Sequence, residues 1–197
     1  SETFKVQGRL GLGEVQLRSL QFAYNQAQQF ARSPQGWLLL MGGYGSGKTH
    51  LAAAIANQMV EMGGPTMFVT VPDLLDWLRF SFEGGDTTLE QRLDDIRNVR
   101  LLVLDDLGTQ NATPWAGEKL FVILNYRYVN RLPLVITTNL SLKDIDDRIA
   151  SRLGDPDLVS RLEINAPDYR SPVSDESRSV VSSLSLMSDQ TFGSFSS

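Results

Sequence analysis

Two hydrophobic spacings alternate along this chain, and together they predict alternating helices and strands. Over residues 13–31 apolar residues recur every three or four positions, which predicts an amphipathic helix that covers an edge of the sheet. Short apolar runs predict buried strands at residues 37–41, 66–70, 99–104 and 134–138. Helical patterns follow these strands, at residues 51–60, from Pro72 onward, at 89–96 and at 116–128. This order predicts an α/β fold with a doubly wound parallel sheet flanked by helices.

The loop after the first predicted strand has the pattern of a phosphate-binding site. Residues 42–49 fit G-x-x-x-x-G-K-[ST] between a strand and a helix. Main-chain N–H groups of such a turn, with those at the start of the next helix, bind phosphate oxygens. We expect Lys48 to reach the β and γ phosphates of a nucleoside triphosphate as a catalytic residue, and the Thr49 hydroxyl to bind Mg²⁺. The residues expected to contact this nucleotide are Gly42, Gly43, Tyr44, Gly45, Ser46, Gly47, Lys48, Thr49 and His50.

Polar residues follow two predicted strands at the edge where the nucleotide must lie. The strand ending at Leu104 leads into Asp105 and Asp106, which is a Walker B pattern. We expect Asp105 to orient Mg²⁺ and its waters, and Asp106 to act as the base or positioning group for the attacking water. Asn139 follows the strand at residues 134–138. If that strand lies between the other two, its amide is expected to hold the attacking water or contact the γ phosphate.

Composition narrows the class of protein. The 197 residues include no cysteine, which excludes disulfides and thiolate metal sites, and His50 is the only histidine, so no zinc site is expected. No apolar run is long enough to span a membrane, and the first residues lack a secretory pattern, so a cytoplasmic protein without a membrane partner is expected. The formal net charge of −5 argues against coating of duplex DNA by bulk electrostatics. Most arginines are expected to be solvated or at helix C-termini.

These motifs, together with the segments Ile136-Thr137-Thr138-Asn139 and Arg148-Ile149-Ala150-Ser151-Arg152-Leu153, resemble one family of ATPases. Over roughly residues 3–170 the chain resembles an AAA+ ATPase, and more narrowly the bacterial replicative-helicase loaders of the DnaC and DnaI type. The resemblance implies a P-loop NTPase fold, here with little or no helical lid. It also implies that Asn139 is the sensor 1 residue and that Arg152 is an arginine finger inserted into a neighbouring subunit's site.

Two other arginines are candidates for the role of arginine finger. Arg148 and Arg161 lie near Arg152, and spacing alone does not choose among the three. A guanidinium supplied by a neighbour neutralises charge on the transferred phosphoryl group, so hydrolysis depends on self-association. Arg170 lies where the loader family has a sensor 2 arginine, which would contact the nucleotide. The pair Asp105-Asp106 departs from the Asp-Glu of many AAA+ enzymes, so slow turnover is expected.

The resemblance implies a hexameric replicative helicase and single-stranded DNA as partners. Aromatic and basic residues suited to base stacking and phosphate contact occur at Trp77, Arg79, Phe80, Phe82, Arg92 and Arg97. Most of these aromatics are expected in the core, with at most one or two exposed. The closest alternative is a transposition helper ATPase of the IstB type that acts on duplex DNA. A small-molecule P-loop kinase and a scaffold that does not hydrolyse ATP are more distant alternatives, and a GTPase is disfavoured because Asn-Lys-x-Asp is missing.

The organisation of the chain is expected to be simple. Residues 1–170 form the predicted ATPase domain, and the serine-rich residues 171–197 form a predicted disordered tail whose apolar side chains leave partner docking open. Loaders usually carry an N-terminal domain that binds the helicase, whereas this sequence begins at the ATPase module. We therefore expect either that the sequence is a piece of a longer protein or that the protein recruits its partner through another surface.

Overall fold

The structure is a computed structural model, and it describes residues 2–82, 88–108 and 113–165. The predicted tail, Arg170 and the expectation about a helical lid lie outside these residues.

The described residues form one parallel sheet with five strands. The strand order is β2 (Thr66–Thr70), β3 (Leu101–Leu107), β4 (Leu134–Thr138), β1 (Trp37–Met41) and β5 (Val159–Glu163). All four pairings of neighbouring strands are parallel, which confirms the predicted doubly wound sheet. β4 lies between β3 and β1. Asn139, which follows β4, therefore lies between the strand with the acid pair and the strand that leads into the phosphate loop, as its expected role requires.

Two strands differ from the prediction. β5 was not predicted, because three of its five residues are polar and exposed, as is possible at an edge strand, which β5 is among the described residues. β3 was expected to end at Leu104, but it continues through Asp105 and Asp106 to Leu107. The acid pair therefore lies within β3, where its pairing with β4 is irregular, rather than in a loop after the strand.

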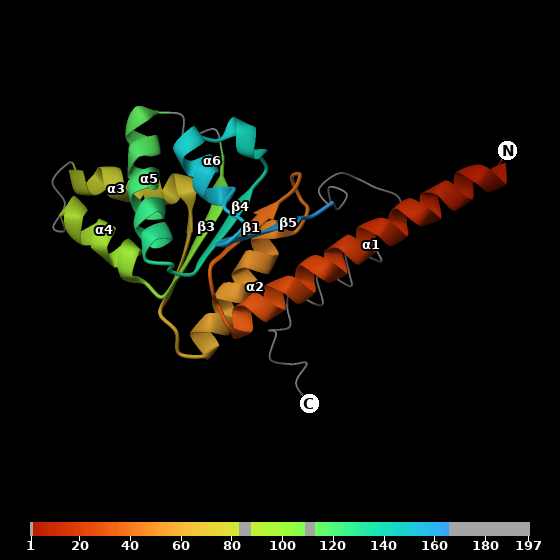
Figure 1. Cartoon of the computed structure of the whole chain (residues 1–197), viewed down its shortest axis with the longest axis horizontal. Coiled ribbons are helices and arrows are strands. Elements are labelled where there is room, and N and C mark those ends of the chain that lie inside the picture. The colour runs from red at the N-terminus through yellow and green to blue at the C-terminus, as the bar shows by residue number, and fades with distance from the viewer. Residues whose placement is uncertain (1, 83–87, 109–112, 166–197) are drawn as a thin grey trace.

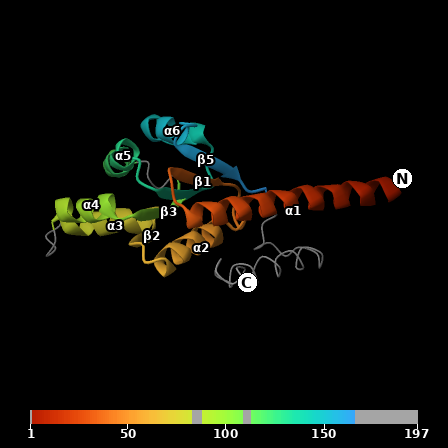
Figure 2. The same ribbon diagram turned by 60° about the horizontal axis from the view of Figure 1, so that its bottom comes forward.

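Helices cover both faces of the sheet, because residues of a strand point alternately to opposite sides. Leu38 and Leu40 of β1 pack with α1 (Glu2–Arg32) and α2 (Lys48–Glu61). Trp37 and Leu39 of the same strand pack on the other face. That face is covered by α3 (Val71–Phe82), α4 (Leu89–Asn98), α5 (Pro114–Val129) and α6 (Asp147–Leu153), with a 3₁₀ turn η2 (Leu142–Asp144) before α6. Figures 1 and 2 show α2 on one side of the sheet and α5 and α6 on the other.

The N-terminal helix α1 is longer than predicted, since it begins at Glu2 rather than at residue 13. Its second half buries apolar residues from Leu20 to Ala31 against the core formed with α2. The Ser19 hydroxyl donates to the Glu163 carbonyl, 3.3 Å away on β5, so the helix covers this edge of the sheet as predicted. Its first half extends beyond the sheet (Figure 1). Neither this helix nor any other in the described residues is long and apolar enough to cross a bilayer.

Arg127 lies in the last turn of α5, where arginines were expected, but its side chain is completely buried rather than solvated. Its guanidinium donates to the carbonyls of Ile96, Arg97, Val99, Arg100 and Pro133. These carbonyls belong to the end of α4, the connection to β3 and the connection to β4. Burial lowers the pKa of Arg127 to about 10, against an opposing effect of Tyr126, so the group stays charged at neutral pH. One side chain thus supplies hydrogen-bond donors to main-chain carbonyls of both connections.

We expect Arg127→Met to lower the free energy of unfolding by about 3 kcal/mol, because several buried carbonyls lose their donor. Arg127→Lys should recover only part of this loss, since an ammonium has three N–H donors in place of five. Urea unfolding followed by circular dichroism measures both variants. The control is Arg100→Met, at an exposed position of the same connection, where a change within about 0.5 kcal/mol is expected. An Arg127→Met protein as stable as the parent would contradict this role.

Candidate functional site

The candidate site lies at the carboxyl ends of β1, β3 and β4. β1 leads into the phosphate loop, β3 carries Asp105 and Asp106, and β4 is followed directly by Asn139. The carboxyl ends of parallel strands meet at one edge of the sheet, which is where open α/β sheets bind ligands. The order β3-β4-β1 therefore gathers three segments that are far apart in the sequence.

Glycine at two loop positions is required by the backbone. Gly42 has a φ of +152°, and a Cβ placed there would lie 2.5 Å from the Ile164 carbonyl oxygen. The same segment donates from the Ile164 N–H to the Met41 carbonyl at 2.7 Å, so the loop is anchored beside β5. Gly47 has a φ of +92° and is the N-cap of α2, whose first turn has no acidic residue. The positive end of the α2 dipole is thus not compensated by a carboxylate of its own first turn.

Lys48 is buried inside the loop that it belongs to. Its ammonium donates to the carbonyls of Gly42 at 2.8 Å and Gly43 at 2.7 Å, and to the Ser46 hydroxyl at 3.2 Å. Burial lowers the pKa of Lys48 from its ordinary value, while Asp105 and Asp106 act in the opposite direction. An ammonium that has lost part of its hydration interacts strongly with a polyphosphate, so Lys48 is suited to bind one.

Thr49 connects the phosphate loop to the first Walker B acid. Its hydroxyl donates to Asp105, with Oγ1 at 2.9 Å from Oδ1 and 3.2 Å from Oδ2. Because the hydroxyl hydrogen points to the carboxylate, the lone pairs of Oγ1 remain for a cation such as Mg²⁺. Within the described residues no group of three His, Asp or Glu side chains is arranged to hold a metal ion alone. The donor set fits a cation that shares its coordination between Thr49, waters oriented by Asp105 and phosphate oxygens.

The second acid differs from the first in burial and backbone. Asp105 is buried, whereas Asp106 is exposed and has a φ of +60°, a left-handed conformation that is uncommon for residues other than glycine. Such strain concentrates at functional sites. Asn139 is half-buried immediately after β4, between the other two strand ends.

The remaining residues expected to contact ATP lie at the outer side of the loop. Tyr44 is 71% exposed, and His50 in the first turn of α2 is exposed as well. Both positions are open to a ligand. Arg170 lies outside the described residues.

Three arginines were candidates for a trans-acting role, and the structure gives them different surroundings. Arg148 forms ion pairs with Glu118 and Asp146. Arg152 donates from Nε and Nη2 to the Asn125 amide oxygen, at 2.9 and 2.8 Å, and from Nη1 to the Arg148 carbonyl. The charge of Arg148 is compensated by carboxylates, while the hydrogen bonds of Arg152 go to neutral groups. Arg161 is exposed on the edge strand β5.

Sequence reasoning missed the residues that hold Arg152. Asn125 of α5 accepts two of its hydrogen bonds, and the guanidinium lies 4.7 Å from the ring centroid of Phe121 and 5.5 Å from that of Tyr128. The positions 121, 125 and 128 share one face of a helix, because they are spaced by four and three residues. No motif marks these residue types, so only the packing of α6 on α5 reveals them.

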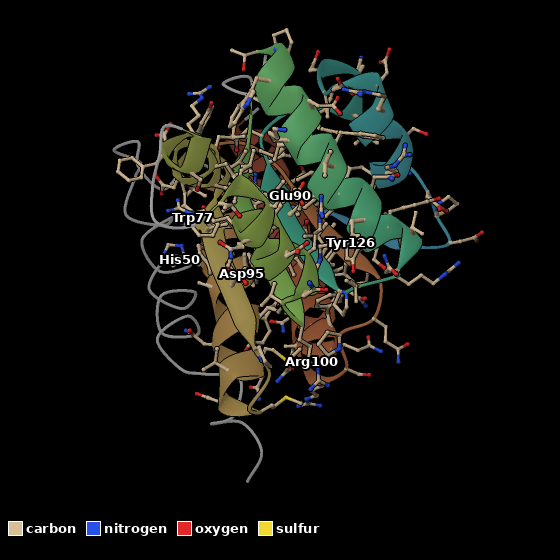
Figure 3. The ribbon with its side chains drawn as sticks, turned by 90° about the vertical axis from the view of Figure 1, so that its left-hand side faces the viewer. His50, Trp77, Glu90, Asp95, Arg100 and Tyr126 are labelled. Atoms are coloured by element: carbon tan, nitrogen blue, oxygen red, sulfur yellow. The ribbon has the colours of Figure 1, made fainter. Side chains whose placement is uncertain are left out.

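The segment expected to contact single-stranded DNA is partly exposed. Among its described aromatic side chains, Trp77 is 37% and Phe80 is 66% exposed. The number exposed among these stays within the expected one or two, but the expectation that most of the three aromatics lie in the core is wrong. The Arg92 guanidinium lies 4.7 Å from the centre of the Trp77 ring. Figure 3 also labels Glu90 and Asp95 on α4 of this face. The surface therefore mixes acidic side chains with aromatic and basic ones.

Known proteins resemble this chain in sequence and in structure. A family profile described as IstB-like ATP binding protein matches residues 13–162. Replicative helicase loader DnaC of Escherichia coli (strain K12) is 29% identical over 136 residues, covering 68% of this chain and 56% of DnaC. Replicative helicase loader DnaI of Bacillus subtilis (strain 168) is 35% identical over 105 residues, covering 53% of this chain and 33% of DnaI.

A solved structure titled "Crystal structure of the DnaC helicase loader" matches with a TM-score of 0.66 and 27% identity, covering 75% of this chain and 90% of that one. This similarity confirms the predicted P-loop AAA+ fold and the resemblance to helicase loaders. The chain spans about half the length of the first curated relatives that it matches.

We expect Gly42→Ala to weaken ATP binding at least about tenfold, because the new Cβ meets the Ile164 carbonyl and displaces the loop. Isothermal titration calorimetry with Mg-ATP measures this affinity. Gly43→Ala is the matched control, since a Cβ at Gly43 meets no atom within 4 Å. Its affinity should stay within about twofold of the parent, which is roughly 0.4 kcal/mol. Equal affinities for the two variants would show that the close approach at Gly42 does not matter.

Proposed function

Because the chain belongs to the family of IstB-like ATP binding proteins, we propose that it is an ATPase that assembles with further copies and loads a replicative helicase onto single-stranded DNA. The observation that carries the enzymatic part is the hydrogen bond between Thr49 and Asp105. It joins the phosphate loop to the acid pair, so one bound nucleotide would contact both.

Each residue of the site has a distinct role in this proposal. Lys48 and the loop N–H groups bind the β and γ phosphates, and Thr49 with Asp105 holds Mg²⁺, which neutralises phosphate charge when bound. Asp106 orients the attacking water or accepts its proton, since it is exposed beside the buried Asp105. Asn139 contacts the same water or the γ phosphate from the adjacent strand end. The shorter reach of Asp106, compared with glutamate, favours slow turnover.

Arg152 is our candidate for the arginine that acts on a neighbouring copy. It lies on α6, on the face of the sheet opposite α2, and its hydrogen bonds within the described residues stay with α5 and α6. The neutral amide of Asn125 orients the guanidinium without cancelling its charge. Arg148 is a weaker candidate, because a phosphate would have to compete with Glu118 and Asp146.

We expect Arg152→Ala to leave the affinity of the isolated subunit for Mg-ATP within about twofold, yet to lower assembly-dependent phosphate release by about 10³-fold. The reason is that the guanidinium acts on a nucleotide bound by another copy. Calorimetry at low protein concentration and phosphate release at increasing protein concentration measure the two effects. Arg148→Ala and Arg161→Ala are the matched variants. If one of them loses concentration-dependent turnover while Arg152→Ala keeps it, the role belongs to that arginine.

The loading function is supported by the relatives named Replicative helicase loader, DnaC and DnaI. The IstB-like family match favours a second candidate, a transposition helper ATPase that acts on duplex DNA. The two candidates differ in the nucleic acid that they bind. Exposed aromatics on α3 support single-stranded DNA, because unstacked bases can stack on Trp77 and Phe80. The net charge of −5 also makes tight binding along a duplex unfavourable.

We expect Phe80→Ala to weaken binding of a fluorescent polythymidine strand at least about fivefold, which corresponds to roughly 1 kcal/mol of stacking. Fluorescence anisotropy with an ATP analogue, repeated over a range of salt concentrations, measures the affinity. Phe22→Ala is the control, because Phe22 is similarly exposed (58%) but lies on α1. Tighter binding to the duplex of the same strand with polyadenine would reject the loader in favour of the transposition helper. Co-elution with a hexameric helicase, measured with and without an ATP analogue, then tests whether the protein binds this partner.

A further inference from the structure

The pairing of β3 with β4 is interrupted beside the acid pair. Leu104 is opposite Ile136, but the next paired residues are Leu107 and Thr138. Two residues of β3, Asp105 and Asp106, therefore stand opposite Thr137 alone, which is the geometry of a β-bulge. The left-handed backbone conformation of Asp106 accommodates the extra residue of β3.

The Thr137 side chain takes over the hydrogen bonding that the bulge interrupts. Its hydroxyl oxygen lies 2.9 Å from the main-chain N of Asp106 and 2.6 Å from Oδ1 of Asp105. The Asp106 N–H can only donate, so the hydroxyl accepts there and its own hydrogen goes to the carboxylate. The bond to Asp105 is short, as expected for a hydroxyl that donates to an ionised carboxylate. Thr137 is almost completely buried, so water does not replace these contacts readily.

Asp105 consequently receives two hydroxyl donors from different elements. Oδ1 accepts from Thr49 of the phosphate loop at 2.9 Å and from Thr137 of β4 at 2.6 Å. Two donors on different elements restrict the rotation of the carboxylate. Two residues beyond Thr137, the same strand is followed by Asn139.

We propose that Thr137 is a positioning residue, which holds the Asp105 carboxylate and the left-handed Asp106 backbone in register with β4 and thereby with Asn139. This inference rests on the proposed Mg-ATP site and adds a residue that acts through the acid pair. Removal of the hydroxyl removes the hydrogen bond between Thr137 and the Asp106 N–H and lets the Asp105 carboxylate rotate about its bond to Thr49. The binding of phosphates by the loop itself does not involve Thr137.

The test compares Thr137→Val, which keeps the shape without the hydroxyl, with Thr137→Ser, which keeps the hydroxyl. Calorimetry with a slowly hydrolysed ATP analogue is run in EDTA and over a Mg²⁺ titration. For Thr137→Val we expect metal-free affinity within about twofold of the parent, and a Mg²⁺ half-saturation raised about tenfold, as for other residues that orient metal ligands. The kcat of Thr137→Val should fall by at least about tenfold, with KM little changed. Thr137→Ser should restore the Mg²⁺ half-saturation and the kcat of the parent.

Thr138→Val is the matched control, because it removes another fully buried hydroxyl from the same strand. That hydroxyl donates to the Leu107 carbonyl and accepts from the Leu140 N–H, without contacting Asp105. An equal rise in Mg²⁺ half-saturation for Thr138→Val and Thr137→Val would overturn the proposal, since a general loosening of the strand would explain both. An unchanged Mg²⁺ half-saturation in Thr137→Val would overturn it as well. If Thr137→Val does not fold by circular dichroism, Thr137→Ala takes its place in the same comparisons.

Lys48→Ala separates this inference from the proposed function. A parent protein that binds the analogue no better than Lys48→Ala would refute the ATP site itself. A parent that binds it well, together with a Thr137→Val variant indistinguishable from it, would refute only the role of Thr137.

Discussion

Two hydroxyl groups converge on the carboxylate of Asp105, and the geometry of the candidate site depends on that convergence. One hydroxyl comes from Thr49 of the phosphate loop and the other from Thr137 of β4. They can meet only because β4 lies between β1 and β3 in the sheet. A different strand order would leave the acid pair without one of its anchors. The crossover topology, rather than any single loop, thus brings the phosphate cradle and the acids within hydrogen-bond distance.

Three arginines illustrate how surroundings decide what one residue type does. Arg127 is buried and organises main-chain carbonyls, so its charge serves the fold. Arg148 is compensated by two carboxylates at the surface. Arg152 is oriented by the Asn125 amide and by aromatic rings, which leaves its charge for an anion. The contrast between neutral and acidic partners is the reason why we favour Arg152 as the residue that acts between copies.

The sequence predicted the sheet and the phosphate loop well, because both are encoded by local patterns. Buried parallel strands are continuous apolar runs, and the loop is one contiguous motif. The strand β5 escaped detection because Ser160, Arg161 and Glu163 interrupt its apolar pattern at an exposed edge. Burial of Arg127 depends on carbonyls that are up to 31 residues away, and the role of Thr137 depends on a bulge that only strand pairing creates. Interactions of this kind arise from tertiary structure and leave no periodic signal.

The guanidinium of Arg127 also limits how this chain can be cut or rearranged. The connections around residues 96–100 and at Pro133 run between regular elements, where new termini or inserted tags are usually tolerated. Here their carbonyl groups are bound to a single buried cation. Circular permutation or insertion of a reporter domain at either connection would pull those carbonyls away from the cation. The turn after α2, around Gly63, holds no such group and is the more suitable place for an engineered junction.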